Sequence, residues 1–211
     1  MPKTIERPLR GIPSYSLESG SPAAEPDDGA GYVPFGNMES RNSLQERLEI
    51  PLLLRALRLP CGGRVLEVGC GRGVALPVLA ERLRPEELAG IDVDRSLIEA
   101  ARRRVVRTGA NAVVRVADVR LLPFESERFD LVIDFGTCYH VSGGIAGQRA
   151  ALREIARVLR VGGLFVHETR VAQHLAHPVR SFGRRLQWTA VPSLVAERRA
   201  ILWTARRRVS T

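Results

Sequence analysis

A glycine-rich turn directly follows a short apolar run in the stretch R-V-L-E-V-G-C-G-R-G, residues 64–73. Glycines at alternate positions let a ligand approach the backbone, and a helix that starts after such a turn presents free N–H groups. The apolar run also carries a carboxylate, Glu67, which is costly to bury without a partner. This combination predicts a ligand site at the turn, and the other acidic residues decide its kind.

Acidic residues end three further apolar runs, at Asp92, Asp118 and Asp134. In an open parallel sheet, ligands bind beyond the carboxyl ends of the strands, so these side chains are expected to meet there. The turn reads G-x-G-x-G, whereas a dinucleotide fingerprint needs G-x-G-x-x-G. Asp92 lies about 20 residues after the last glycine, where an acid binds the ribose diol both in dinucleotide sites and in sites for other nucleosides. Asp92 therefore predicts a bound ribose but does not distinguish a dinucleotide from another nucleoside ligand.

Glu67 and Asp118 distinguish a dinucleotide from another nucleoside ligand. Together with Asp92 they place three carboxylates around one cleft, which repels a diphosphate but suits an ammonium, a ribose and an adenine amino group. Asp118 is expected to accept a hydrogen bond from the adenine N6 amino group, while the backbone of Val119 donates one. The acids thus predict a nucleoside joined to methionine as the ligand.

The elements that position these residues alternate along the chain. Strands are expected at 64–69, 87–92, 112–118, 128–136 and 163–169. Helices are expected from Asn42 to Leu57 and at 74–84, 96–108 and 147–160, with Gly162 and Gly163 ending the last one. Near-continuous apolar strands between helices indicate parallel βαβ units, hence an α/β fold with helices on both faces of the sheet.

The two ends of the chain differ from this pattern. Residues 187–196 and 198–206 are rich in strand formers, and the short gap between them predicts an antiparallel C-terminal hairpin. Residues 1–36 are rich in Pro, Gly, Ser and acid and predict a flexible arm, or a lid that orders over the substrate. Residues 37–211 are then one domain.

Composition excludes some classes of protein. The formal net charge is +9, and Lys3 is the only lysine, so arginine supplies nearly all the positive charge. This balance indicates either an acidic partner or a compositional bias toward arginine. No apolar run is long enough to span a bilayer, and the three separated cysteines form no disulfide or zinc pattern. A soluble cytoplasmic protein is expected.

Several segments carry a family resemblance when taken as a set: V-L-E-V-G-C-G-R-G, G-I-D-V-D, A-D-V-R-L-L-P-F, E-R-F-D-L-V-I-D-F-G and L-R-E-I-A-R-V-L-R-V-G-G-L-F-V-H-E. In order and spacing, from about residue 44 to 170, the chain resembles the class I S-adenosylmethionine-dependent methyltransferases. It is most similar to the small-molecule group that includes the ubiquinone/menaquinone methyltransferases. The resemblance implies a Rossmann-like, mostly parallel seven-stranded sheet that ends in an antiparallel hairpin.

The resemblance also assigns cofactor-binding residues, with S-adenosyl-L-methionine as the cofactor. The methionine moiety is expected at Glu67, Gly69, Cys70, Gly71 and Gly73; the ribose at Asp92 and Val93; the adenine at Asp118 and Val119; and the sulfonium side at Asp134, Phe135 and Gly136. The implied activity is methyl transfer to a small molecule, without a metal. A non-catalytic, cofactor-binding or regulatory protein is the alternative.

His140, a few residues after the fourth strand, is the candidate general base, or else packs beneath its loop. Tyr139 positions substrate or packs, and His167 with Glu168 forms a second candidate pair. Nucleic acid is disfavoured as the substrate, because D-F-G-T after the fourth strand lacks an Asn/Asp-Pro-Pro-aromatic pattern. The acceptor atom, whether O, N or C, and the oligomeric state are not determined by the sequence.

Overall fold

The computed structural model of the chain describes residues 38–170, 186–192 and 200–207. The proposed arm or lid at 1–36 and the basic segment 171–185 lie outside the described residues. The helices are α1 (Met38–Leu44), the π-helical turn η1 (Gln45–Glu49), α2 (Ile50–Leu57), α3 (Leu76–Leu83), α4 (Arg95–Thr108), α5 (Thr137–His140) and α6 (Gly144–Val158). The strands are β1 (Arg64–Val68), β2 (Glu87–Asp92), β3 (Val113–Val116), β4 (Phe129–Asp134), β5 (Leu159–Arg170), β6 (Leu186–Pro192) and β7 (Ala200–Arg207).

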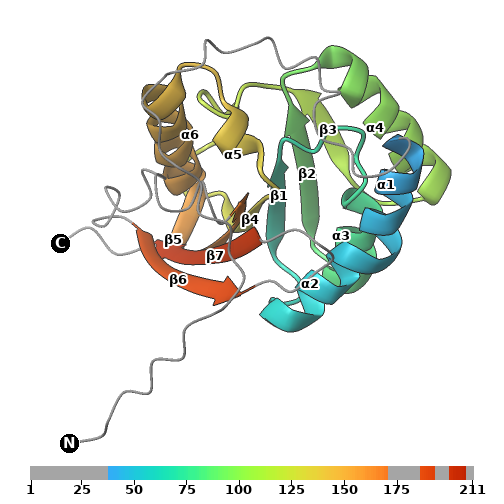
Figure 1. Cartoon of the computed structure of the whole chain (residues 1–211), viewed down its shortest axis with the longest axis horizontal. Coiled ribbons are helices and arrows are strands. Elements are labelled where there is room, and N and C mark those ends of the chain that lie inside the picture. The colour runs from blue at the N-terminus through green and yellow to red at the C-terminus, as the bar shows by residue number, and fades with distance from the viewer. Residues whose placement is uncertain (1–37, 171–185, 193–199, 208–211) are drawn as a thin grey trace, which may run out of the picture.

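Five parallel strands form the sheet in the order β3-β2-β1-β4-β5. Strand order therefore reverses between β1 and β4, and their carboxyl ends make the switch point at which such sheets bind ligands. This arrangement confirms the predicted Rossmann-like α/β fold (Figure 1). The glycine turn leaves β1 at this switch point, which is why its position matters.

Two more strands continue the order beyond β5, as β7 and then β6, both in antiparallel register. The connecting residues 193–199 are outside the described part of the chain. The predicted C-terminal hairpin and the count of seven strands therefore stay predictions.

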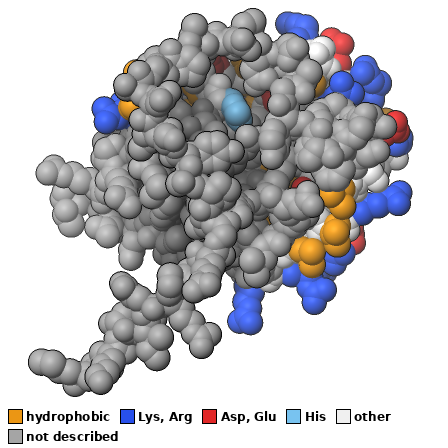
Figure 2. All heavy atoms as spheres, viewed as in Figure 1, with side chains coloured by type: hydrophobic (Ala, Val, Ile, Leu, Met, Phe, Trp, Pro, Cys, Tyr) orange, Lys and Arg blue, Asp and Glu red, His pale blue; other side chains and the backbone are white. Residues whose placement is uncertain are grey.

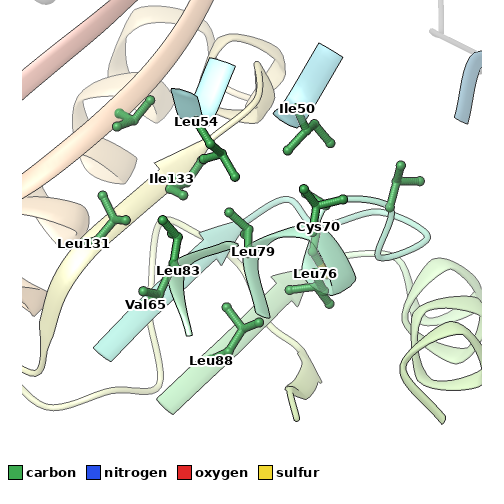
Figure 3. Close-up of a cluster of buried hydrophobic side chains, with 14 of the residues drawn as sticks. Ile50, Leu54, Val65, Cys70, Leu76, Leu79, Leu83, Leu88, Leu131 and Ile133 are labelled. Carbon is green, nitrogen blue, oxygen red and sulfur yellow. The ribbon is translucent and has the colours of Figure 1, made fainter. Parts of the chain in front are cut away.

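Each face of the sheet has its own apolar core, because successive side chains of a strand point to opposite faces. One face packs Val65, Leu131 and Ile133 against α2, α3 and α4 (Figure 3). The other packs Leu66 and Phe165 against α6. Figure 1 shows α6 on one side of the sheet and α3 with α4 on the other. Both faces are covered, as predicted.

The end of α6 differs from the prediction. Gly162 and Gly163 were expected to stop a helix over 147–160, but the helix ends at Val158 and Leu159 is already extended. Both glycines lie inside β5, where the pairing with β4 shifts from Phe129↔Leu159 to Leu131↔Leu164. Gly162 has φ +74°, and a Cβ on Gly163 would lie 2.9 Å from the backbone oxygen of Arg160. The glycines thus permit a bulge in the strand, and the helix-stop interpretation was wrong.

The N-terminal helices bury a different face from the one that their leucine spacing indicates. Leu44, Leu48 and Leu52 recur at helical spacing, yet Leu48 and Leu52 are 46% and 42% exposed. The π-helical turn η1 adds a residue to one helical turn and so rotates the face that α1 and α2 present. As a result Glu49 and Ile50 turn inward and are buried.

Candidate functional site

The glycines of the turn after β1 are required for packing as well as for ligand access. Gly69 has φ +67°, and a Cβ there would overlap the Thr137 side chain at the start of α5. Gly73 has φ +70°, and its Cβ would lie 3.0 Å from the Cβ of Ala101 in α4. A Cβ on Gly71 would meet no atom of the described residues within 4 Å. Only Gly71 of these three therefore opens onto free space, while the other two let α5 and α4 approach the turn.

Asp92, at the end of β2, ties the turn to the neighbouring strand. Its Oδ2 accepts a hydrogen bond from the Gly71 backbone N–H at 2.9 Å, and its Oδ1 accepts one from the Asp94 N–H, also at 2.9 Å. A carboxylate offers about four lone-pair sites, so further hydroxyl donors can still bond to it. Asp94 caps α4, because its side chain accepts hydrogen bonds from the N–H groups of Ser96 and Leu97.

Glu67 is the most unusual side chain at this edge of the sheet. It is only 4% exposed, and its Oε2 has no hydrogen-bond partner among the described residues. Burial, and then the negative charges of Asp134 and Asp92, raise its pKa to about 8. A buried carboxyl group with a free oxygen is costly in the folded protein, so its presence indicates that a donor or a cation binds there.

A cavity of about 220 Å³ lies beside Glu67. Gly69, Cys70, Gly71 and Phe135 of the predicted site line it. Burial and the charge of Glu67 raise the pKa of Cys70, so its thiol stays neutral and serves as a wall. This space, called here the Glu67 cavity, is the candidate cofactor pocket at the methionine end.

The opposite wall of the Glu67 cavity comes from the N-terminal helices, which sequence reasoning missed. The lining residues from these helices are Asn42, Gln45, Glu49, Ile50 and Leu53. Glu49 is 8% exposed and has no hydrogen bond or ion pair with any described residue. A signal for this wall existed in the polar residues 42, 45 and 49, which recur at helical spacing beside buried leucines.

Asp118 and Val119, the predicted adenine residues, follow β3 and do not line the Glu67 cavity. The Arg120 guanidinium holds both oxygens of Asp118, with Nε at 3.0 Å from Oδ1 and 2.9 Å from Oδ2. These bonds from Arg120 lower the pKa of Asp118. Val119 is buried, whereas Val93, predicted near the ribose, is 71% exposed. An adenine contact of Asp118 therefore stays a prediction.

Asp134 points to the α6 side of the sheet, away from the Glu67 cavity. It is fully buried and accepts hydrogen bonds from His167 Nδ1 at 2.7 Å and from the Thr137 N–H at 2.6 Å. It also accepts from the N–H of Cys138, whose thiol pKa is raised by burial and by the nearby Asp134 charge. This buried pair anchors the first turn of α5 and joins β4 to β5, so His167 is a positioning residue here rather than an exposed base.

The short helix α5 carries the two residues named as catalytic candidates. His140 is its last residue and is exposed, close behind Phe135 and Gly136 in the chain. The side chains of Tyr139 and Glu168 are outside the described part of the structure. The geometry therefore keeps His140 accessible at the carboxyl edge of the sheet, and its role as a base stays a prediction.

Comparisons with known proteins match this architecture. Residues 65–163 match the family described as Methyltransferase domain. A fatty-acid O-methyltransferase of Mycolicibacterium smegmatis is 38% identical over 106 residues, which are 50% of this chain and 36% of that protein. A phosphatidylethanolamine N-methyltransferase of Cereibacter sphaeroides is 34% identical over 117 residues, 54% of this chain and 52% of that protein. This chain thus spans about half or less of the length of these relatives.

A solved S-adenosylmethionine-dependent methyltransferase from Aquifex aeolicus superposes with a TM-score of 0.64 at 18% identity, covering 79% of this chain and 93% of that one. It shows the shared fold. Residues 65–163, slightly less than half of the chain, accordingly match a methyltransferase domain in sequence, and the described residues share the fold of an S-adenosylmethionine-dependent methyltransferase. The narrower resemblance to the ubiquinone/menaquinone group stays a prediction.

The Aquifex aeolicus protein depends on S-adenosylmethionine, and the described residues of this chain would fit the same cofactor. The free Oε2 of Glu67 and the buried carboxylate of Glu49 suit the ammonium of the methionine moiety. The open space over Gly71 suits a close approach to the backbone. A diphosphate would face the buried acidic side chains of Glu67 and Glu49, whose ionisation it would oppose, and is therefore disfavoured.

Proposed function

We propose that this protein transfers the methyl group of S-adenosylmethionine to a small-molecule acceptor. The observation that carries the proposal is the buried Glu67 carboxyl group, which borders a cavity of about 220 Å³ and whose Oε2 has no hydrogen-bond partner in the described part of the chain. Because a lone buried carboxyl destabilises the fold, its placement at the switch point supports a cationic ligand.

In this proposal each chemical group of the cofactor contacts its own set of residues. Glu67 and Glu49 bind the ammonium group of the cofactor. Asp92 accepts hydrogen bonds from the ribose hydroxyls in addition to those from the backbone N–H groups of Gly71 and Asp94. Asp118 and Val119 contact the adenine. Since the pKa of Glu67 is raised to about 8, its carboxyl is mostly protonated at neutral pH, and a bound ammonium shifts it toward the carboxylate. Cofactor binding at neutral pH is therefore expected to release a proton.

The bound cofactor supplies an electrophilic sulfonium methyl group, and transfer is an in-line displacement that depends mainly on positioning. The protein contributes the cavity walls, the fixed turn and an accessible His140. When the acceptor is a hydroxyl, His140 would take its proton as general base. We expect His140→Ala to lower turnover more than about tenfold while leaving cofactor affinity unchanged, as measured by steady-state rates and calorimetry. Unchanged turnover would remove His140 as the base.

The acceptor is proposed to be a small molecule with a lipid-like portion. The names of the relatives support this, since one acts on a fatty acid and another on phosphatidylethanolamine. We also propose that β6 and β7 complete a seven-stranded sheet, that residues 1–36 act as an arm or lid, and that the protein works in the cytoplasm. The three free cysteines agree with a reducing compartment.

Calorimetric titration of the full chain with S-adenosylmethionine and S-adenosylhomocysteine tests the cofactor first. Saturable binding of both is expected, and no binding of either would refute the proposal. A second step incubates the protein with methyl-labelled cofactor and a panel of fatty acids, phospholipids and quinone precursors. Labelled product identifies the acceptor class, whereas cofactor binding without turnover on a whole metabolite extract would favour the non-catalytic alternative.

A further inference from the structure

A second and larger hollow, about 740 Å³, lies between α4 and the N-terminal helices α1 and η1. Arginines from three separate elements line it, and we call it the arginine groove. They are Arg47 of η1, Arg72 of the glycine turn, and Arg103, Arg104 and Arg107 of α4. Figure 2 shows Lys and Arg side chains (blue) projecting along the margin where α4 and the N-terminal helices lie in Figure 1.

The arrangement on α4 is one-sided. Residues 100, 103, 104, 107 and 108 line the groove and recur at the spacing of a single helix face. Arg95 and Arg102, on the same helix, do not line it. A general enrichment in arginine explains arginines on every exposed face, but it does not explain their convergence with Arg47 and Arg72 across a hollow.

The carboxylates at the groove leave most of these arginines uncompensated. Glu46 pairs with Arg104 at 2.5 Å and so joins η1 to α4. Glu39 also lines the groove, but no ion pair joins it to a described residue. Within the described residues, Arg47, Arg72, Arg103 and Arg107 have no ion pair or hydrogen bond through their side chains. Like charges held across one hollow repel each other, so an anion that enters it is attracted by all of them.

The chemistry of the lining selects the kind of anion. The planar guanidinium fork binds phosphate oxygens in pairs, and several forks facing one space can surround a phosphate group. Ala100 is the only described lining residue with a small apolar side chain, so the groove offers little to a lipid tail. A hollow of this volume encloses a compact ligand better than it fits a flat membrane surface.

We propose that the arginine groove is a binding site for a soluble, phosphate-bearing small molecule. The proposal stands apart from the methyltransferase function, since it needs neither Glu67 nor the cofactor. The two spaces nevertheless share Asn42 and Arg72 in their linings. A ligand in the groove is thus in contact with residues that also border the cofactor cavity.

Pyrophosphate is the test ligand, titrated calorimetrically into the full chain at about 0.15 M ionic strength, where weak long-range attraction is screened. We expect saturable binding that Arg103→Gln with Arg107→Gln weakens about tenfold or more, the loss expected from removing charge-assisted hydrogen bonds. The matched control is Arg95→Gln with Arg102→Gln, which removes the same charge from the opposite side of α4 and should change affinity less than about twofold. Thermal unfolding of both variants checks that the fold is intact.

Equal loss in the two double variants would overturn the proposal, because it would show attraction to net charge alone. Absence of saturable pyrophosphate binding to the wild-type chain would overturn it as well. Sedimentation with phosphatidylglycerol and phosphatidylcholine vesicles distinguishes the lipid source. Binding to the anionic vesicles that depends on Arg103 and Arg107, without pyrophosphate binding, would replace the soluble ligand by a membrane surface and refute the proposal as stated.

Discussion

The Glu67 cavity and the arginine groove lie on two sides of the same N-terminal helices; the first contains buried acidic side chains and the second several arginines. Asn42 and Arg72 line both. The acids of the cavity are buried, with Glu67 4% and Glu49 8% exposed, whereas Arg47, Arg72, Arg103 and Arg107 are exposed. Burial determines how much stability each site costs the protein while no ligand is bound. A buried carboxyl without a partner destabilises the unliganded protein, whereas exposed guanidinium groups are solvated and cost little stability.

The largest effect is expected where a buried hydrogen-bonded pair is broken. His167→Ala removes the ring that bonds to Asp134 at 2.7 Å, and both residues are fully buried. Emptying the space of the buried ring and leaving Asp134 without this partner should together lower the free energy of unfolding by about 3–5 kcal/mol. Urea unfolding measures the loss, with the exposed His140→Ala as a control that should cost less than about 1 kcal/mol. Similar values for the two variants would contradict the assignment of His167 as an anchor.

The next prediction concerns the cost of Glu67 itself. Because its pKa is raised from 4.5 to about 8, the folded protein binds a proton that the unfolded chain releases. Its contribution to stability is therefore fully present below about pH 4.5, and it is lost as pH rises toward about 8. Glu67→Gln removes this dependence, so the cofactor-free variant should gain stability over the wild type between pH 5 and pH 8, by a few kcal/mol.

Urea unfolding across that pH range, without cofactor, gives the difference between the Glu67→Gln variant and the wild type. The same variant should bind S-adenosylmethionine more weakly, so that stability and binding change in opposite directions. A constant difference from pH 5 to pH 8 would show that Glu67 is not protonated in the folded protein.

Glu49 provides a smaller but more specific test of the cavity wall that the N-terminal helices form. Glu49→Gln removes one carboxylate from the Glu67 cavity and should weaken S-adenosylmethionine binding about tenfold, the value of one hydrogen bond to a charged group. Glu46→Gln is the matched control, because Glu46 lies in the same π-helical turn but faces the arginine groove. Equal affinities of the two variants, measured by calorimetry, would exclude Glu49 from the cofactor site.

The smallest effect is in the response to salt. Raising the ionic strength from about 0.05 to 0.3 M should weaken pyrophosphate binding several-fold, because the groove is exposed and its charges are screened. Cofactor binding at the buried acids should change less over the same range. A steeper salt dependence for the cofactor than for pyrophosphate would reverse the comparison between the two sites.

The order of elements and the switch-point site were predictable because they depend on local pattern. Apolar runs that alternate with helices require a covered parallel sheet, and the acids at the strand ends must then gather at one edge. Asp94 caps α4 for an equally local reason, since aspartate directly before a helix bonds to the free N–H groups of the first turn. Other features depend on contacts between distant segments and left no local signal, such as the His167–Asp134 pair and the overlap that requires glycine at Gly69.

The sequence by itself determined the α/β class, the glycine turn and the acids that favour a methionine-linked nucleoside over a diphosphate. Only the tertiary structure decided which face each helix turns inward, since one π-helical turn moved Glu49 into the cavity and left Leu48 and Leu52 exposed. It also decided that Gly162 and Gly163 bend a strand instead of ending a helix. The physical reason is the same in both cases: side-chain direction depends on a backbone phase that packing sets, which spacing along the chain does not record.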